Sequence, residues 1–188
     1  NCIIKNNSAF SYSGILYEKH GGGIHLYKSS STLNNLIIKN NSSNLDGGGI
    51  VVTEEEFSAN NTYNVTINNS KIHNNDCLDH GGGVSVLGSS PIFIDCIISG
   101  NNSGFTAGGF HGIGRLGAHI IGGKIHSNRS TGPGGGVHIA TPGPVDSSHI
   151  SFTDVDIFLN HAGIDGGGGG SDGGGISIGD PIVLNLAG

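Results

Sequence analysis

The chain has 188 residues and a formal charge of −6, from 8 lysines and arginines against 14 aspartates and glutamates. It carries no basic stripe that could neutralise phosphates, so nucleic acid is not expected as a partner. No apolar run approaches the length of a membrane helix, so we expect no membrane span in this segment. Each of the 36 glycines would destabilise a helix interior by roughly 1 kcal/mol, so we expect no helices.

Six similar blocks follow one another along the chain, and each contains an isoleucine followed three residues later by an asparagine. The isoleucines are Ile4, Ile38, Ile72, Ile98, Ile125 and Ile157, and the asparagines are Asn7, Asn41, Asn75, Asn101, Asn128 and Asn160. A glycine-rich cluster follows each asparagine, beginning at Gly21, Gly47, Gly81, Ala107, Gly134 and Gly173. Short apolar strands are predicted after these clusters, at residues 24–26, 50–52, 84–86, 137–139 and 176–178.

The spacing of these blocks predicts one coil of a solenoid per block. Successive asparagines of the series are separated by 26 to 34 residues. The longer intervals contain extra residues after Asn7, around 53–63 and around 140–148, and removing them leaves about 26 residues per unit. A unit of this size cannot bury its apolar face alone, so it must stack on its neighbours.

A second column of residues marks a tight bend in each coil. Three residues before each isoleucine stand only Asn, Asp or Gly, the residues that tolerate a left-handed backbone, at Asn1, Asn35, Asn69, Asp95, Gly122 and Asp154. Three short strands per coil, separated by this bend, an asparagine turn and a glycine turn, predict an all-β fold. We therefore expect a right-handed parallel β-helix of about six coils, spanning residues 1–188 as a single domain.

The asparagines of the turn are expected to stack as a ladder. Each side-chain amide would satisfy backbone groups that the turn leaves unpaired. A glycine-rich disordered chain is the competing interpretation, and it fails because the apolar residues are periodic and β-branched.

Two motifs of the repeat resemble those of a known family. The Ile-x-x-Asn and Gly-Gly-Gly-Ile or Gly-Gly-Gly-Val motifs resemble the F-x-x-N and G-G-A-I motifs of chlamydial-type polymorphic outer-membrane proteins. They are also similar to the wider set of right-handed parallel β-helix repeat proteins of bacterial and protist surfaces. The resemblance implies a surface-exposed scaffold, adhesion and, more rarely, carbohydrate chemistry. The right-handed coil is likewise expected from the chirality of parallel crossovers.

Sequons for N-glycosylation are abundant, and they fall into two groups. Asn41, Asn101 and Asn128 belong to the turn column, where we expect a structural role. The polar loop of residues 53–64 offers Asn60 and Asn64, and a glycan there would meet no packing conflict. Asn6, Asn40 and Asn68 are further candidates.

Neither the acids nor the histidines form a convincing catalytic or metal-binding set. Asp95 and Asp154 fall in the bend column, which indicates a conformational role, and residues 54–56 read as a solvated acidic loop. The histidines at 25, 111 and 138 are expected on the exposed face of their strands, with no third ligand beside the neighbouring pair His111 and His138. No catalytic residue, metal or cofactor is therefore predicted.

Neither end of the repeat looks capped. Asn1 already stands in the bend column, and Pro181 is followed by an apolar segment that reads as the start of a seventh coil. We therefore expect either further repeats of a longer extracellular chain or end-to-end self-association. The leading hypothesis is a glycosylated structural or adhesive scaffold outside the cell or on its surface, stacking head to tail as a filament subunit. The alternatives are a carbohydrate-active enzyme, either a polysaccharide lyase or a glycoside hydrolase, and a carbohydrate-binding module.

Overall fold

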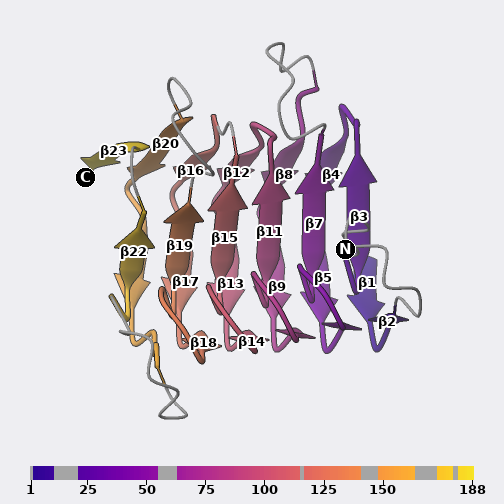
Figure 1. Cartoon of the computed structure of the whole chain (residues 1–188). Helices are drawn as coiled ribbons and strands as arrows, with labels where there is room; N and C mark the ends of the chain where they lie inside the picture. Colours follow the sequence, from indigo (N-terminus) through magenta and orange to yellow (C-terminus); the bar gives the residue numbers. More distant parts are fainter. Residues whose placement is uncertain are drawn as a thin grey trace.

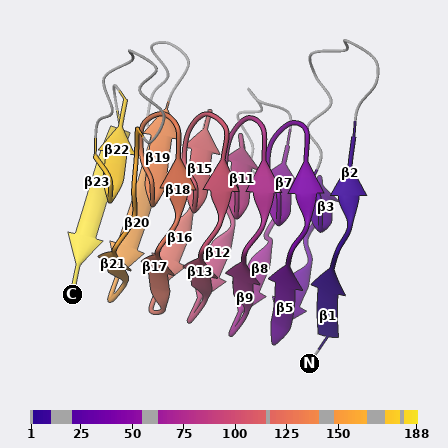
Figure 2. The same ribbon diagram turned by 90° about the horizontal axis from the view of Figure 1, so that it is seen from below.

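The computed structural model of the chain describes residues 2–10, 21–54, 63–114, 117–140, 148–163, 173–179 and 182–188. These residues form strands and turns and no helix, and the strands pair in parallel in four sheets. The chain coils so that each sheet runs along the length of the molecule (Figures 1 and 2). The predicted fold class, a parallel β-helix, is confirmed. A right-handed crossover stays the expectation for its hand.

Each coil contributes one strand to sheets A, C and D, and the first five coils also contribute one to sheet B. Sheet A holds β1 (Cys2–Lys5), β5 (Leu36–Lys39), β9 (Lys71–His73), β13 (Ile97–Ser99), β17 (Lys124–His126) and β21 (Asp156–Phe158). Sheet B holds β2 (Ser8–Ala9), β6 (Ser42–Ser43), β10 (Asp76–Cys77), β14 (Asn102–Ser103) and β18 (Arg129–Ser130). Sheet C holds β3 (Ile24–Tyr27), β7 (Ile50–Thr53), β11 (Val84–Leu87), β15 (Phe110–Ile113), β19 (Val137–Ala140) and β22 (Ile176–Ile178). Sheet D holds β4 (Thr32–Asn34), β8 (Thr66–Asn68), β12 (Ile92–Ile94), β16 (His119–Ile121), β20 (Ser148–Thr153) and β23 (Ile182–Ala187).

The anchoring isoleucines stack in one column inside the coil. In sheet A, Ile38 pairs with Ile72, which pairs with Ile98, and the register continues through Ile125 to Ile157. The four central members are at most 1% exposed. Sheets C and D add their own inward columns, and Phe110 of sheet C meets Phe93 of sheet D edge to face at 5.6 Å. This continuous apolar core holds the sheets together.

The coil has four strands, whereas the sequence pattern predicted three. The additional strand is the two-residue element of sheet B, which lies between the asparagine turn and the glycine cluster. Two residues are too few to show a period of two, so no hydrophobic alternation could reveal this strand. It forms because the asparagine turn places the following backbone in register with the coil beside it, as in the hydrogen bond from the Asp76 N–H to the Asn41 carbonyl.

Left-handed residues form the corners of each coil. The bend residues described by the structure have positive φ, at Asn35 (55°), Asn69 (47°), Asp95 (50°), Gly122 (64°) and Asp154 (53°), while Asn1 lies outside the described residues. A further left-handed column directly precedes the asparagine ladder, at Asn6, Asn40, Asn74, Gly100, Ser127 and Leu159. The glycine turn provides another, at Gly47, Gly81, Ala107, Gly134 and Gly173. The coil therefore changes direction at residues with a left-handed backbone, a conformation that strains glycine and asparagine less than other residues.

No helix capable of crossing a bilayer occurs in the part of the chain that the structure describes.

Candidate functional site

The six turn asparagines stand one above another, and each bonds to the next. Asn101 shows the pattern, since its Oδ1 accepts from the backbone N–H of Asn75 at 2.9 Å and from Asn75 Nδ2 at 3.0 Å. Its own Nδ2 donates to Asn128 Oδ1 and to the carbonyl of Ile72, both at 3.0 Å. Related bonds continue to Asn7 at one end and Asn160 at the other.

The glycine cluster leaves room for this ladder. A β-carbon on Gly83 would lie 2.8 Å from Asn101 Nδ2 and 2.7 Å from the carbonyl oxygen of Gly109. Any larger residue would therefore push against the side chain of the ladder and against the adjacent coil. The asparagine and glycine motifs of the repeat are two halves of one packing arrangement.

Burial of the ladder bears on glycosylation. Asn41, Asn101 and Asn128 are at most 1% exposed, and each uses its Nδ2, the atom that a glycan would modify, in two hydrogen bonds. A glycan on any of them would require the coil to open. Their sequons therefore lie where the folded chain gives a glycosyltransferase no access.

The other sequons lie at more accessible places. Asn64 is exposed at the edge of the inserted loop, and Asn60 lies outside the described residues. Asn6 and Asn40 are also exposed, in the left-handed column before the ladder. Asn68 is half-buried in β8, and its Nδ2 donates to Asn34 Oδ1 at 2.8 Å.

The middle of the outer face of sheet C is buried, and the expectation of exposed histidines there was wrong for His111. Val51, Ser85 and His111 occupy this outward column at 0%, 0% and 2% exposure, whereas His25 is exposed and His138 is half-buried. The glycine turn lies against Val51 and Ser85, since a β-carbon on Gly47 would be only 2.2 Å from Val51 Cγ2 and one on Gly81 would be 3.0 Å from Ser85 Cβ. Sequence alternation shows which side a residue faces, and it does not show what covers that side.

The rings of His111 and His138 stack face to face, with centroids 5.8 Å apart and planes 8° apart. Stacked faces do not direct two nitrogen lone pairs at one point, so this pair is not arranged to chelate a metal. Burial lowers the pKa of His138, and the charge of His80 adds to the effect.

Glu54 is a second correction, since it was predicted in a solvated loop. It is 6% exposed, and its Oε1 accepts a hydrogen bond from Ser89 Oγ at 3.0 Å. Burial raises the pKa of Glu54, while the Ser89 hydrogen bond acts in the opposite direction. Residues 55 and 56 lie outside the described part of the chain.

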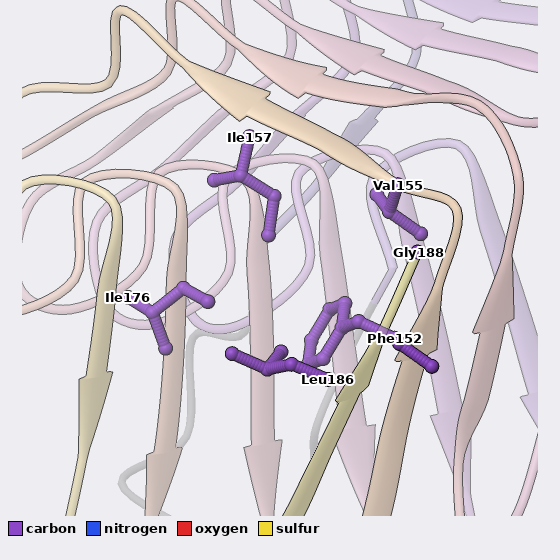
Figure 3. A pocket seen from close by; sticks show the side chains of 7 residues that line it. Phe152, Val155, Ile157, Ile176, Leu186 and Gly188 are labelled. Carbon is purple, nitrogen blue, oxygen red and sulfur yellow. The ribbon is translucent and has the colours of Figure 1, made fainter.

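The last described coil leaves its apolar interior open. A hollow of about 470 Å³ is lined by Phe152, Val155, Ile157, Ile176 and Leu186 from three sheets (Figure 3). One coil earlier, the equivalent residues Ile120, Ile125 and Val137 are at most 3% exposed because the following coil covers them. The hollow is thus the place that another coil of the same kind would fill.

The opposite end is also incompletely covered. Ile4, Ile24, Leu26 and Leu33 of the first coil pack against the core but remain partly exposed. Ile3, although apolar, does not belong to these inward columns. It pairs with Ile37, which pairs with the outward Lys71, so strand alternation places Ile3 on the outer face at 53% exposure.

Comparison of the chain with protein-family models, with curated proteins and with solved structures finds no match. Its chemistry must therefore be read from its own surfaces. Among the described residues, the arrangement offers two partly open apolar coil ends at the outermost strands, and between them a repetitive flank with exposed sequons.

Proposed function

We propose that this protein is an extracellular structural or adhesive scaffold whose coils extend by head-to-tail stacking against a second copy of the chain. The single observation that carries the proposal is the open apolar end, where the hollow beside Leu186 is lined by residues of the same inward columns that meet at the preceding coil junction. The residues that the first coil presents, Ile4, Ile24 and Leu33, belong to the same three columns that fill these junctions inside the molecule.

Stacking would pair exposed backbone groups and bury exposed apolar side chains at the same time. It would add parallel backbone hydrogen bonds to the edge strands of all four sheets, and it would remove apolar surface from water at roughly 25 cal/mol per Å². The two ends are different surfaces, so the contact is heterologous and propagates along the axis instead of closing into a dimer. Exposed sequons such as Asn64 lie on the flank, where glycans would hinder lateral clumping without blocking the ends.

The resemblance of the repeat to polymorphic outer-membrane proteins supports the surface location within this proposal. The Ile-x-x-Asn motif forms the ladder, and the Gly-Gly-Gly motif packs on it, so both parts of the resemblance correspond to structural parts of one coil. A cell-surface scaffold is also a setting in which exposed sequons could be modified.

Substitution of Leu186 tests the stacking contact. Leu186 is 62% exposed at the open end, so Leu186→Asp should leave the isolated chain folded while weakening self-association at least tenfold. Leu78 is a matched control, because it is 66% exposed on a loop after β10 in a middle coil, and Leu78→Asp should leave association unchanged.

Sedimentation velocity across a range of protein concentrations, with electron microscopy of the same samples, would measure the assembly. We expect rods that lengthen with concentration for the unsubstituted chain and the Leu78→Asp variant, and shorter species for Leu186→Asp. A chain that stays monomeric at high concentration, or equal association by both variants, would contradict head-to-tail stacking. Further repeats of the same chain would then be the occupant of the open end.

A further inference from the structure

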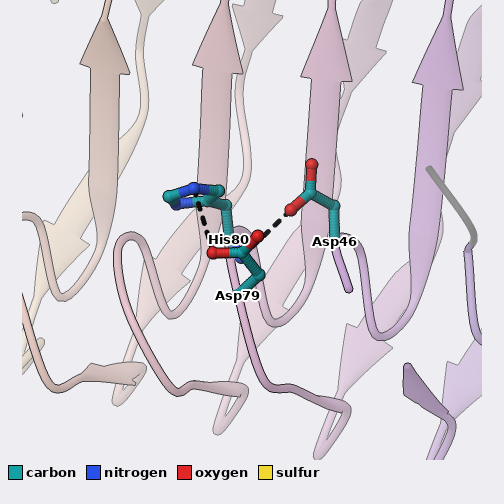
Figure 4. Close-up of side chains that lie close together, drawn as sticks. All are labelled: Asp46, Asp79 and His80. Carbon is teal, nitrogen blue, oxygen red and sulfur yellow. Dashed lines mark hydrogen bonds and ion pairs between the residues drawn. The ribbon is translucent and has the colours of Figure 1, made fainter. Parts of the chain in front are cut away.

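Two consecutive coils bring two aspartates and a histidine together in front of the glycine turn. Asp46 precedes Gly47 in one coil, and Asp79 and His80 precede Gly81 in the next (Figure 4). Asp46 and His80 occupy equivalent positions, since the backbone N–H of Gly47 donates to the carbonyl of His80. Asp46 is 0% exposed, whereas the side chains of Asp79 and His80 are 38% and 22% exposed, so the cluster reaches from the interior of the turn to solvent.

The ligand atoms of these three side chains converge. His80 Nε2 lies 3.1 Å from Asp79 Oδ1, and one candidate atom from each residue lies within 4.8 Å of the other two. Metal bonds of roughly 2.0–2.2 Å place neighbouring tetrahedral ligands about 3.3 Å apart, which is close to the distance between Nε2 and Oδ1. In Figure 4 the Asp79 carboxylate lies between the imidazole and the Asp46 carboxylate.

The imidazole is held from its other side. His80 Nδ1 is 2.7 Å from Thr106 Oγ1, the ring stacks on His111 at 4.6 Å, and it meets Phe105 edge to face at 5.2 Å. With Nδ1–H donating to Thr106 Oγ1, a metal ion would take the place of the proton that Nε2 otherwise donates to Asp79 Oδ1. A histidine fixed in this way through its second nitrogen is the usual arrangement of a metal ligand.

Charge also favours a cation at this place. Asp46 is a fully buried acid, and buried carboxylates are stable when they are paired or coordinate a metal. The backbone N–H of His80 donates to Asp46 Oδ1 at 3.2 Å and fixes this carboxylate beside the second one. A dication would compensate both carboxylates, which a single imidazolium cannot do.

We propose that Asp46, Asp79 and His80 bind one divalent cation of the Zn²⁺ type, with solvent completing its coordination. One nitrogen and two carboxylate oxygens suit Zn²⁺, whereas Ca²⁺ takes six or more oxygen ligands. Because the ligands come from two coils, the ion would clip these coils together and stabilise the folded chain. This inference does not depend on head-to-tail stacking.

Isothermal titration of the purified chain with ZnCl₂ tests the site. We expect one equivalent of Zn²⁺ to bind, and Asp79→Asn and His80→Gln each to weaken binding at least tenfold. Thr106→Val, which removes the partner of Nδ1, should weaken binding about 10- to 100-fold. Circular dichroism checks folding of each variant, and if His80→Gln unfolds, Asp79→Asn at its partly exposed position decides.

Two controls exclude other sites. Cys77→Ser should bind Zn²⁺ as tightly as the unsubstituted chain, because serine occupies this column in the coils on either side, at Ser43 and Ser103. His138→Gln, in the stack but outside the cluster, should also bind normally. Absence of saturable binding, full affinity in Asp79→Asn, loss of binding in Cys77→Ser, or equal affinity for Ca²⁺ would each overturn the proposal.

Discussion

Replacing Asn101 by leucine removes one step of the asparagine ladder while keeping a side chain of similar size. The change deletes four side-chain hydrogen bonds, two accepted from Asn75 and two donated to Ile72 and Asn128. The backbone N–H of Asn75 and one of its Nδ2 hydrogens then lose their acceptor at a residue that is 1% exposed. Each unsatisfied buried group costs about 1–3 kcal/mol, so we expect the loss of these two acceptors to lower the free energy of unfolding by about 2–6 kcal/mol.

Urea denaturation followed by circular dichroism would measure this loss, with the slope of the transition compared between variants to confirm that the same surface unfolds. Asn102→Leu is the matched control, since Asn102 is the exposed neighbour and its Nδ2 donates to Asp76 Oδ1 at 2.7 Å. We expect that change to stay within about 0.5 kcal/mol. Equal losses for the Asn101 and Asn102 variants would refute the reasoning, because burial and ladder bonding are what distinguish the two sites.

Three further predictions concern single positions. In glycosylated native protein, glycopeptide analysis should find Asn64 modified and Asn128 bare, because the latter is 0% exposed; the reverse pattern would contradict the burial argument. Leu159 has φ 53° and is 67% exposed, so Leu159→Asn should relieve left-handed strain and raise the free energy of unfolding by about 0.5–1 kcal/mol. An unchanged or lower melting temperature would count against that strain. Burial raises the pKa of Glu54 above its ordinary value of 4.5. Ionisation of Glu54 therefore opposes folding increasingly as the pH rises from 4.5 to the raised pKa of the folded chain. Glu54→Gln should therefore raise the melting temperature at about pH 7 and have little effect at about pH 3. A stabilisation of the same size at both pH values would exclude this cause.

Much of the fold could be predicted from the sequence, because every coil of a solenoid has the same arrangement of strands and turns. The spacing of Ile72, Ile98 and Ile125 gives the coil length, and alternation in the three predicted strands gives the inward side. The bend residues could be recognised because left-handed backbone restricts the choice to a few residue types. Ser127 and Leu159 show the limit of that rule, since the left-handed column before the ladder also holds residues that carry no such signal.

The two-residue strands of sheet B were decided by tertiary pairing, because so short an element has no periodicity of its own. Burial of His111 was decided in the same way, because its ring stacks on His80 and on His138. Whether a side chain is exposed depends on what lies above it, and that partner comes from another part of the coil.

The sequence by itself therefore determined the repeat, its core columns and the asparagine series. Only the tertiary structure decided which polar residues of different coils meet. Asp46 and His80 are 34 residues apart in the chain, and although each directly precedes a glycine cluster, the sequence pattern does not show that their groups meet. Stacking of the coils brings them within hydrogen-bonding distance, because parallel pairing places equivalent residues of successive coils about 4.8 Å apart whatever the length of the loop that joins them.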